Sequence, residues 1–395
     1  MTAAADIPSR SRLKPLDGLR GIAIVLVVVS HGWTIWPTTS LDRNGALKVM
    51  FSSGNFAVSI FFVVGGFLAV RGWLRTIDAG RKPAFGLIAV RRFVRLSSHV
   101  YVMLALVLVI ASVDTTDPYP KTEIRASVVH VLTYTWNDYL ITHALTARPD
   151  LGHLWYLSVD FQVFLCLLAL VYLLGRRRLV LVAVLLAILA VVVVWRQHSY
   201  ATEGYYVALL RATTRMDGLV VGALAAAAMP YLGWLRRSGR FVAPVALVSL
   251  ALWAWLVNSE RGFFGPAALG LNITVALLVM FTVWGTTGRP VNAVLGWRPL
   301  TALGTWSLAI YVWHYPTFWF FSRHGSTWSW ERRAVVALVV TGCVSALSQL
   351  VVERRTQRWL ASPRWSAYHD GLMRGLAGQA RQQISRTRQH DHAGK

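Results

Sequence analysis

The chain has 395 residues, of which 55% are hydrophobic and only 14% are charged, with 40 Lys and Arg residues against 17 Asp and Glu. A soluble domain has about 25% charged residues, so this chain lacks the polar surface that would keep it in water. Its hydrophobicity excludes a disordered chain, and two cysteines exclude a disulfide scaffold. The arginines lie between apolar segments rather than on one polar face, which excludes a nucleic-acid-binding protein.

Ten apolar segments follow one another along the sequence. A spanning helix needs about 17–25 apolar residues, and most of the segments reach that length. The first run is too long for the core of a signal peptide, so we interpret it as a permanent span. The sequence therefore predicts an all-α, polytopic membrane protein with about ten transmembrane helices, at residues 18–36, 53–73, 97–113, 153–174, 179–195, 206–229, 241–257, 267–286, 300–321 and 334–352.

Positive charge predicts the orientation of these helices. Most Lys and Arg residues lie at the N-terminus, in the tail after residue 353, and in the connections 71–96, 175–178, 230–240 and 287–299. All of these segments fall on one side of the membrane, so the positive-inside rule places both termini in the cytoplasm. We expect a membrane domain over residues 1–355 and a basic, disordered cytoplasmic tail over residues 356–395.

The longest connection on the opposite side covers residues 114–152. It carries five acidic residues and the pattern EIRASVVHVLTYTWNDYL. This pattern is compatible with an interfacial helix, with a lid over a site, or with an ordinary surface loop.

Ionisable side chains inside the spans are the main functional signal, because each costs about 2.5–3.5 kcal/mol to insert and usually faces the interior of a bundle. Arg20 and His31 in the first span are 11 residues apart, which is close to three turns, so both lie on one face about 16 Å apart. Asp17 is placed to pair with Arg20. The other ionisable groups are Asp160 in the fourth span, Arg211, Arg215 and Asp217 in the sixth, and His314 in the ninth.

Helix rise places these groups at a similar depth. His31 lies about 21 Å above the inner boundary, and His314 reaches about 20 Å. His153 shares a face with Asp160, and Ser307 and Tyr311 share one with His314. Each residue alone also has a structural explanation: Arg211 can reach the outer interface, and Asp217 can pair with an arginine of another helix. A shared polar cavity suits acyl or phosphoryl transfer with an imidazole base, or proton-coupled transport.

Six sequence blocks carry a family resemblance. In order and on about ten spans, they resemble the acyltransferase-3 family, integral membrane enzymes that acylate glycans, glycolipids and some secondary metabolites. The resemblance extends over about residues 15–355. The blocks are PLDGLRGIAIVLVVVSH (15–31), FFVVGGFL (61–68), RRFVRL (91–96), HLWYLSVDFQVF (153–164), RMDGLVVG (215–222) and LGTWSLAIYVWHYP (303–316).

The resemblance implies a membrane O-acyltransferase in a cell membrane, the bacterial plasma membrane, with acyl-CoA as co-substrate. It implies no permanently bound cofactor and no metal. Arg20 and His31 match the R-x10-H motif of the first helix, and His31 is the leading catalytic candidate. Arg92 and Arg95 match the R-x-x-R motif associated with acyl-CoA, and guanidinium groups bind phosphates well. Residues of the later blocks that match the family, or support its polar cavity, are Asp160, Tyr156, Ser158, His153, Arg211, Arg215, Asp217, Tyr311 and His314.

Three departures from the family pattern are visible. Asp160 stands where the family usually has Glu, Gly65 replaces a common Ser, and Ser97-Ser98-His99 lacks the Pro that usually follows the arginine motif. Some family members carry an extracytoplasmic SGNH domain. None follows the last predicted span here, so we expect this chain to complete the transfer itself or with a separate partner.

The resulting hypothesis is transfer of an acetyl or other short acyl group from acyl-CoA to a hydroxyl of a glycan, glycolipid or secondary-metabolite acceptor. We expect His31 to deprotonate the hydroxyl or relay the acyl group, Asp160 to orient the imidazole, and Arg211 or Arg215 to steady the oxyanion. The expected partners are membrane lipid, acyl-CoA and the acceptor, with no nucleic acid. The alternative is a transporter or flippase for an anionic or lipid-linked solute.

Overall fold

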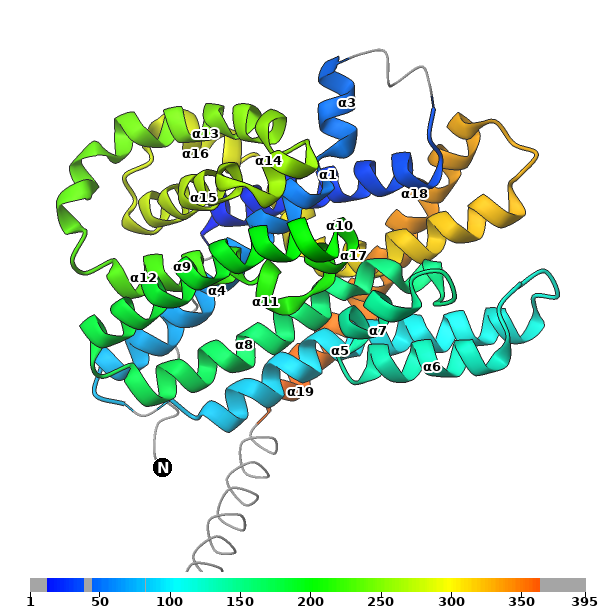
Figure 1. The fold of residues 1–395 in the computed structure, drawn as a ribbon, viewed down its shortest axis with the longest axis horizontal. Coiled ribbons are helices and arrows are strands. Elements are labelled where there is room, and N and C mark those ends of the chain that lie inside the picture. Colours follow the sequence, from blue (N-terminus) through cyan, green and yellow to red (C-terminus); the bar gives the residue numbers. More distant parts are fainter. Residues whose placement is uncertain (1–12, 39–44, 82, 363–395) are drawn as a thin grey trace, which may run out of the picture.

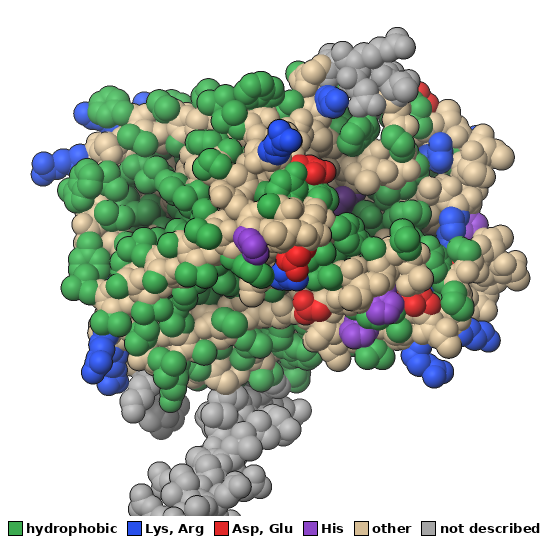
Figure 2. Space-filling view, viewed as in Figure 1, with side chains coloured by type: hydrophobic (Ala, Val, Ile, Leu, Met, Phe, Trp, Pro, Cys, Tyr) green, Lys and Arg blue, Asp and Glu red, His purple; other side chains and the backbone are tan. Residues whose placement is uncertain are grey.

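The computed structural model describes residues 13–38, 45–81 and 83–362, and within these ranges the chain is helical and has no β-strand (Figure 1). Hydrophobic side chains cover much of the face shown in Figure 2, as contact with lipid requires. The elements are α1 (Lys14–Ile35), α3 (Gly45–Ser52), α4 (Gly54–Asp78), α5 (Phe85–Val113), α6 (Lys121–Leu132), α7 (Trp136–His143), η1 (Pro149–Leu154), α8 (Trp155–Leu174), α9 (Arg178–Glu203), α10 (Tyr205–Leu210), α11 (Ala212–Arg215), α12 (Asp217–Ala228), η2 (Gly233–Ser238), α13 (Gly239–Leu256), α14 (Glu260–Phe264), α15 (Pro266–Trp284), α16 (Gly288–Leu295), α17 (Arg298–His324), α18 (Trp330–Ser348), η3 (Gln349–Glu353) and α19 (Arg354–Leu360).

The helical membrane architecture predicted from the sequence is confirmed. Eight helical segments of the described chain are long and apolar enough to cross a membrane, and each overlaps a predicted span. The sixth predicted span differs, because the backbone is extended at Arg211 and the segment divides into α10, α11 and α12. The ninth forms the 27-residue helix α17, whose Trp, Tyr, His and Ser side chains lower its hydropathy. A count of ten and cytoplasmic termini stay predictions.

Several helices extend beyond the apolar segments that predicted them. α5 begins at Phe85, so Arg92 and Arg95 lie on a helix of the bundle, and their predicted place in a 71–96 loop was wrong. α9 continues to Glu203 and carries Arg196, which is fully buried. Hydropathy detects only the apolar part of a helix, which explains both differences. α19 runs past the predicted domain boundary at 355, and most of the predicted tail, 363–395, lies outside the described residues.

Two helix pairs approach so closely that their backbones touch. A Cβ atom added to Gly304 of α17 would lie 1.7 Å from the carbonyl oxygen of Asp17 on α1, and one added to Gly21 would lie 2.1 Å from that of Leu300. The pair α4 and α12 meets in the same way, since a Cβ on Gly222 would lie 2.1 Å from the carbonyl oxygen of Val63. Small residues permit such close packing between membrane helices. These glycines belong to the family-like sequence blocks, so the blocks include packing positions as well as polar ones.

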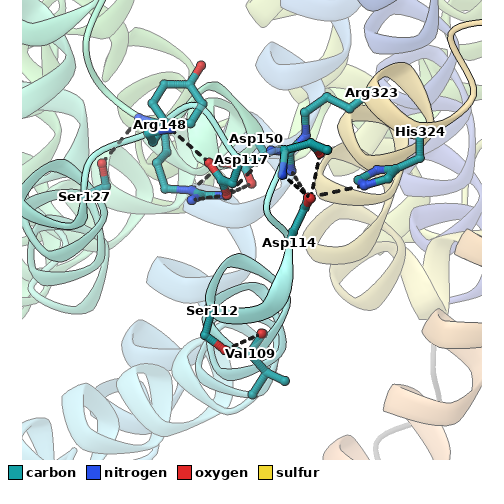
Figure 3. Close-up of polar contacts among 11 residues, drawn as sticks. Val109, Ser112, Asp114, Asp117, Ser127, Arg148, Asp150, Arg323 and His324 are labelled. Carbon is teal, nitrogen blue, oxygen red and sulfur yellow. Dashed lines mark hydrogen bonds and ion pairs between the residues drawn. The ribbon is translucent and has the colours of Figure 1, made fainter.

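The connection 114–152 forms α6, α7 and the start of η1 rather than an irregular loop. Arg148 is almost completely buried and donates to Asp117 at 2.9 Å and to Asp150 at 2.6 Å (Figure 3). Burial opposes the charge of Arg148, but hydrogen bonds and charges from Asp150 and Asp117 outweigh it and raise the pKa of the guanidinium. Arg148 thereby ties the chain before α6 to the start of η1.

The same connection is attached to the end of α17. His324 lies 3.3 Å from the carboxylate of Asp114, and Arg323 lies 3.5 Å from that of Asp117. Figure 3 shows these side chains converging from the two segments. The segment is therefore held over the end of α17, which agrees with an ordered cover rather than a free surface loop.

We predict that Gly304→Ala destabilises the protein by about 1–3 kcal/mol or prevents its accumulation, because the new methyl group overlaps the backbone of α1. Thermal unfolding of the detergent-solubilised protein measures the effect. Gly342→Ala is the matched control, since Gly342 is also a helix glycine and nothing lies within 4 Å of an added Cβ. Equal stability of the two variants would contradict the close-packing interpretation.

Candidate active site

The centre of the candidate site is a pair of histidines from α1 and α17. Nδ1 of His31 lies 2.7 Å from Nε2 of His314, and the two rings are nearly parallel with centroids 5.0 Å apart. His314 is completely buried, whereas His31 is partly exposed. The two residues are far apart in sequence, and the close α1–α17 contact brings them together.

The hydrogen bonds of His314 determine which nitrogen of His31 carries a proton. Nδ1 of His314 lies 2.8 Å from the carbonyl oxygen of Tyr311 and 3.0 Å from that of Ile310. Carbonyl oxygens only accept, so Nδ1 of His314 carries the hydrogen and Nε2 of a neutral ring is an acceptor. His31 must then donate from Nδ1, which leaves the lone pair of its Nε2 available as a base.

A third histidine and two tyrosines surround this pair. The ring of His153 lies 5.4 Å from that of His314 and 6.5 Å from that of His31, and Tyr315 lies 4.7 Å from His31. The hydroxyl of Tyr311 donates to the backbone carbonyl of His153. Both ring nitrogens of His153 are buried and make no hydrogen bond of good geometry in the described chain, although the backbone of Val312 and Tyr311 lies close to the ring. Buried polar atoms are rarely left unpaired, so His153 is a candidate contact for substrate.

Arg20 lies below His31 on the same face of α1, as the helix spacing predicted. Its Nη2 donates to Ser307 of α17 at 2.8 Å, and its Nη1 lies 3.8 Å from Asp17. The predicted contact with Asp17 is thus confirmed. Ser307 and His314 are seven residues apart on α17, so α1 and α17 meet along one polar stripe.

Asp160 does not occupy the place expected for a residue that orients His31. Its carboxylate accepts from Nη2 of Arg92, while His31 bonds to His314 instead. The Arg92 guanidinium also lies over the ring of Phe164, 5.0 Å from the centroid. A Cβ added to Gly65 would be 3.7 Å from the carboxylate of Asp160, an ordinary van der Waals contact, so the position of the missing family Ser lies directly beside this ion pair.

Arg95 pairs with a residue that the sequence interpretation missed. Its Nε lies 3.3 Å from Glu353, whose other carboxylate oxygen is 3.1 Å from Nε2 of the buried His99. Ser348 is 2.8 Å from Nδ1 of the same histidine. The sequence did contain a signal for this site, because Glu353 directly follows the tenth apolar segment, 334–352. Because α5 begins early, the exposed Arg95 side chain reaches the buried Glu353, His99 and Ser348.

The polar residues of the sixth predicted span separate into distinct environments. Arg211 pairs with Glu203 at the partly exposed outer end, which agrees with its interfacial explanation. Asp217 accepts from Arg196 at 2.6 Å and from Asn272 at 2.7 Å, so its predicted pairing with an arginine of another helix is confirmed. Arg196 was missed because the apolar segment ends at residue 195.

Arg215 is buried among aromatic rings. Its guanidinium lies 4.5 Å from the ring centroid of Phe263, 5.6 Å from that of Trp155 and 5.9 Å from that of Phe62. Cation–π contacts stabilise such a charge in a dry environment. Nε and Nη2 of Arg215 are buried and have no hydrogen-bond partner among the described residues, so the expectation that Arg215 steadies an oxyanion stays a prediction.

Tyr156 and Ser158 complete the predicted set on α8. The ring of Tyr156 lies 5.4 Å from that of Tyr311 and 4.8 Å from that of Phe62, so it links the histidine cluster to the aromatic surroundings of Arg215. Ser158 is buried on the same helix. Three helical elements, α1, α17 and η1, thus contribute the groups nearest to His31.

Comparison with known proteins gives a consistent set of relatives. The acyltransferase domain of the acyltransferase-3 family matches residues 14–348. Peptidoglycan O-acetyltransferase OatA of Listeria monocytogenes is 25% identical over 78% of this chain and 50% of its own length. The putative peptidoglycan O-acetyltransferase YrhL of Bacillus subtilis is 26% identical over 87% of this chain and 55% of its own. The putative membrane-bound transacylase BcsY of Komagataeibacter xylinus is 26% identical over 88% of this chain and 84% of its own.

The chain spans about half the length of the first two of these relatives. No solved structure matches it. The matched region includes every helix that contributes to the histidine cluster.

We predict that Arg92→Met destabilises the protein by about 3–5 kcal/mol, because it leaves the buried carboxylate of Asp160 without its partner, and that Asp160→Asn costs less, because the Arg92 side chain is 26% exposed. The double variant should lose less than the sum of the two. Thermal unfolding of all three measures the coupling. Arg91→Met is the control, since Arg91 is an exposed neighbour on α5. Strict additivity of the two losses would show that the pair does not form.

Proposed function

Because this chain belongs to the acyltransferase-3 family, we propose that it moves an acetyl or other short acyl group from acyl-CoA to a hydroxyl of a cell-envelope glycan, glycolipid or related acceptor. The names of the relatives support an acceptor in the cell envelope. The observation that carries the mechanism is the hydrogen-bonded pair of His31 and His314, which leaves one nitrogen of His31 as a base.

In the proposed step Nε2 of His31 takes the proton of the acceptor hydroxyl. The oxygen attacks the thioester carbonyl carbon, a C–O bond forms, and the C–S bond breaks. The CoA sulfur leaves and receives the proton back from Nε2 of His31. Throughout this cycle His314 accepts from Nδ1 of His31 and stabilises the imidazolium, so His314 is a positioning residue.

A group of three arginines supports a donor site below His31. Arg20, Arg92 and Arg95 lie close enough for their charges to interact, and their side chains remain 25%, 26% and 46% exposed. Guanidinium groups favour phosphate oxygens, and the separation of Arg20 from His31 is about 16 Å. We assign the phosphates of acyl-CoA to this group, with the pantetheine arm extending toward His31.

His153 is the best-placed group to stabilise the oxyanion. It lies beside His31, and its ring nitrogens make no hydrogen bond of good geometry within the described residues. An N–H group aimed at developing negative charge lowers the barrier of acyl transfer. The sequence pointed to Arg211 or Arg215 for this role, and Arg211 pairs with Glu203 instead.

We predict that His31→Ala lowers acyl transfer by at least about 100-fold, as expected for loss of a general base or covalent relay. Purified membranes receive labelled acetyl-CoA with and without an extract of cell-envelope acceptors, and released CoA and labelled acceptor are measured. His143→Ala, an exposed histidine of α7, is the control and should keep full activity. Undiminished transfer by a well-folded His31→Ala protein would contradict the proposed mechanism.

The same assay separates the enzyme from the transporter or flippase alternative. A transporter needs the buried arginines but cleaves no thioester. Acceptor-dependent release of CoA supports the enzyme, and its absence from a folded protein supplied with the envelope extract would favour transport.

We predict that His314→Gln retains more activity than His314→Phe. The Gln side-chain oxygen can accept from Nδ1 of His31 and keep the productive tautomer, whereas Phe cannot accept. We expect His314→Phe to lower kcat by about 100-fold with little change in the KM for acyl-CoA. Equal kcat values for the two variants would show that the hydrogen bond does not position His31.

A further inference from the structure

Two adjoining pockets lie at the end of the bundle that the sequence predicts to be cytoplasmic. One has a volume of about 450 Å³ and lies between the end of α4 and the turn that joins α8 to α9. The other, of about 230 Å³, lies between the ends of α4, α12 and α15. Asp78 and Arg178 line both pockets and are joined by two contacts of 2.6 and 2.7 Å.

The lining combines a concentration of positive charge with an apolar wall. Among the described lining residues there are five arginines and one acid, Asp78, which is paired with Arg178. The arginines are Arg71, Arg75, Arg81, Arg176 and Arg178. Leu74, Met229 and Trp284 supply apolar lining in the smaller pocket. Figure 2 shows Lys and Arg side chains near the lower left edge, where Figure 1 places the end of α4.

We propose that these pockets bind the phosphate headgroup of an anionic phospholipid. Guanidinium groups recognise phosphate oxygens, and the apolar wall suits the glycerol and first acyl carbons. Basic pockets between helices at the cytoplasmic surface are a common arrangement for anionic headgroups. The exposed hydrophobic surface of the bundle places lipid beside the pocket.

The position of the pockets separates them from the reaction. Gly175, which lines the larger pocket, follows the last residue of α8, whereas His153 precedes its first. α8 has 20 residues and is therefore about 30 Å long, close to the thickness of the bilayer core. A ligand held in the pockets does not reach His31, and the donor phosphates already have a nearer group of arginines. The phosphates of free CoA are the other source of the same chemistry, so the test includes them.

The test measures lipid binding in a His31→Ala background, which makes the result independent of turnover. Purified protein is titrated with fluorescent phosphatidylglycerol and, separately, phosphatidylcholine. The pocket variant combines Arg75→Gln with Arg176→Gln, two exposed residues that line different pockets. The control combines Arg236→Gln with Arg237→Gln, two exposed arginines of η2 on the same predicted face. Desulfo-CoA is then added as a competitor.

We expect a preference for phosphatidylglycerol that the pocket variant weakens at least tenfold and the control leaves intact, with no displacement by desulfo-CoA. Loss of the same size in the control would show that only the general positive charge of this face matters, and would overturn the proposal. Unchanged binding by a pocket variant with wild-type thermal stability would also overturn it. Displacement of the lipid by desulfo-CoA in the parent protein, but not in the pocket variant, would assign the pockets to the acyl donor instead.

Discussion

The close contact between α1 and α17 is the constraint on which the candidate site depends. Gly304 and Gly21 let the two backbones meet, and this separation brings His31 within hydrogen-bond distance of His314. A side chain at either glycine would push the helices apart and lengthen the bond that selects the tautomer of His31. Packing and chemistry are thus coupled, because a hydrogen bond weakens within a few tenths of an ångström.

Pairs of buried opposite charges are a second constraint on how the helices pack. Asp217 receives Arg196, and Arg148 lies between Asp117 and Asp150, so carboxylates and guanidiniums neutralise each other where water is absent. The Asp217–Arg196 pair joins α9 to α12, and Arg148 joins the chain before α6 to η1, so these buried arginines hold elements together. Arg20, Arg92 and Arg95 are partly exposed, and we assign the anionic donor to them.

The membrane spans and part of the polar stripe were predictable because both follow from helix geometry. Apolar runs of about 20 residues marked the helices, and a spacing of 11 residues put Arg20 and His31 on one face, where both bond to α17. Helix ends were predicted less well, since a helix continues into polar residues that hydropathy does not register. Arg92 and Arg95 were misplaced, and Arg196 was missed, for this reason.

The sequence by itself determined the class of protein, the family-like blocks and the helices that carry Arg20, His31, Asp160 and His314, because these depend on local composition and periodicity. Only the tertiary structure decided which side chains form hydrogen bonds and ion pairs with each other. Asp160 was expected beside His31 from its depth, yet depth does not specify the rotation of a helix, and the rotation turns its carboxylate to Arg92. His314 takes the place beside His31 because Gly21 of α1 and Gly304 of α17 let their helices come into contact, and such a contact between distant segments is a property of the folded bundle.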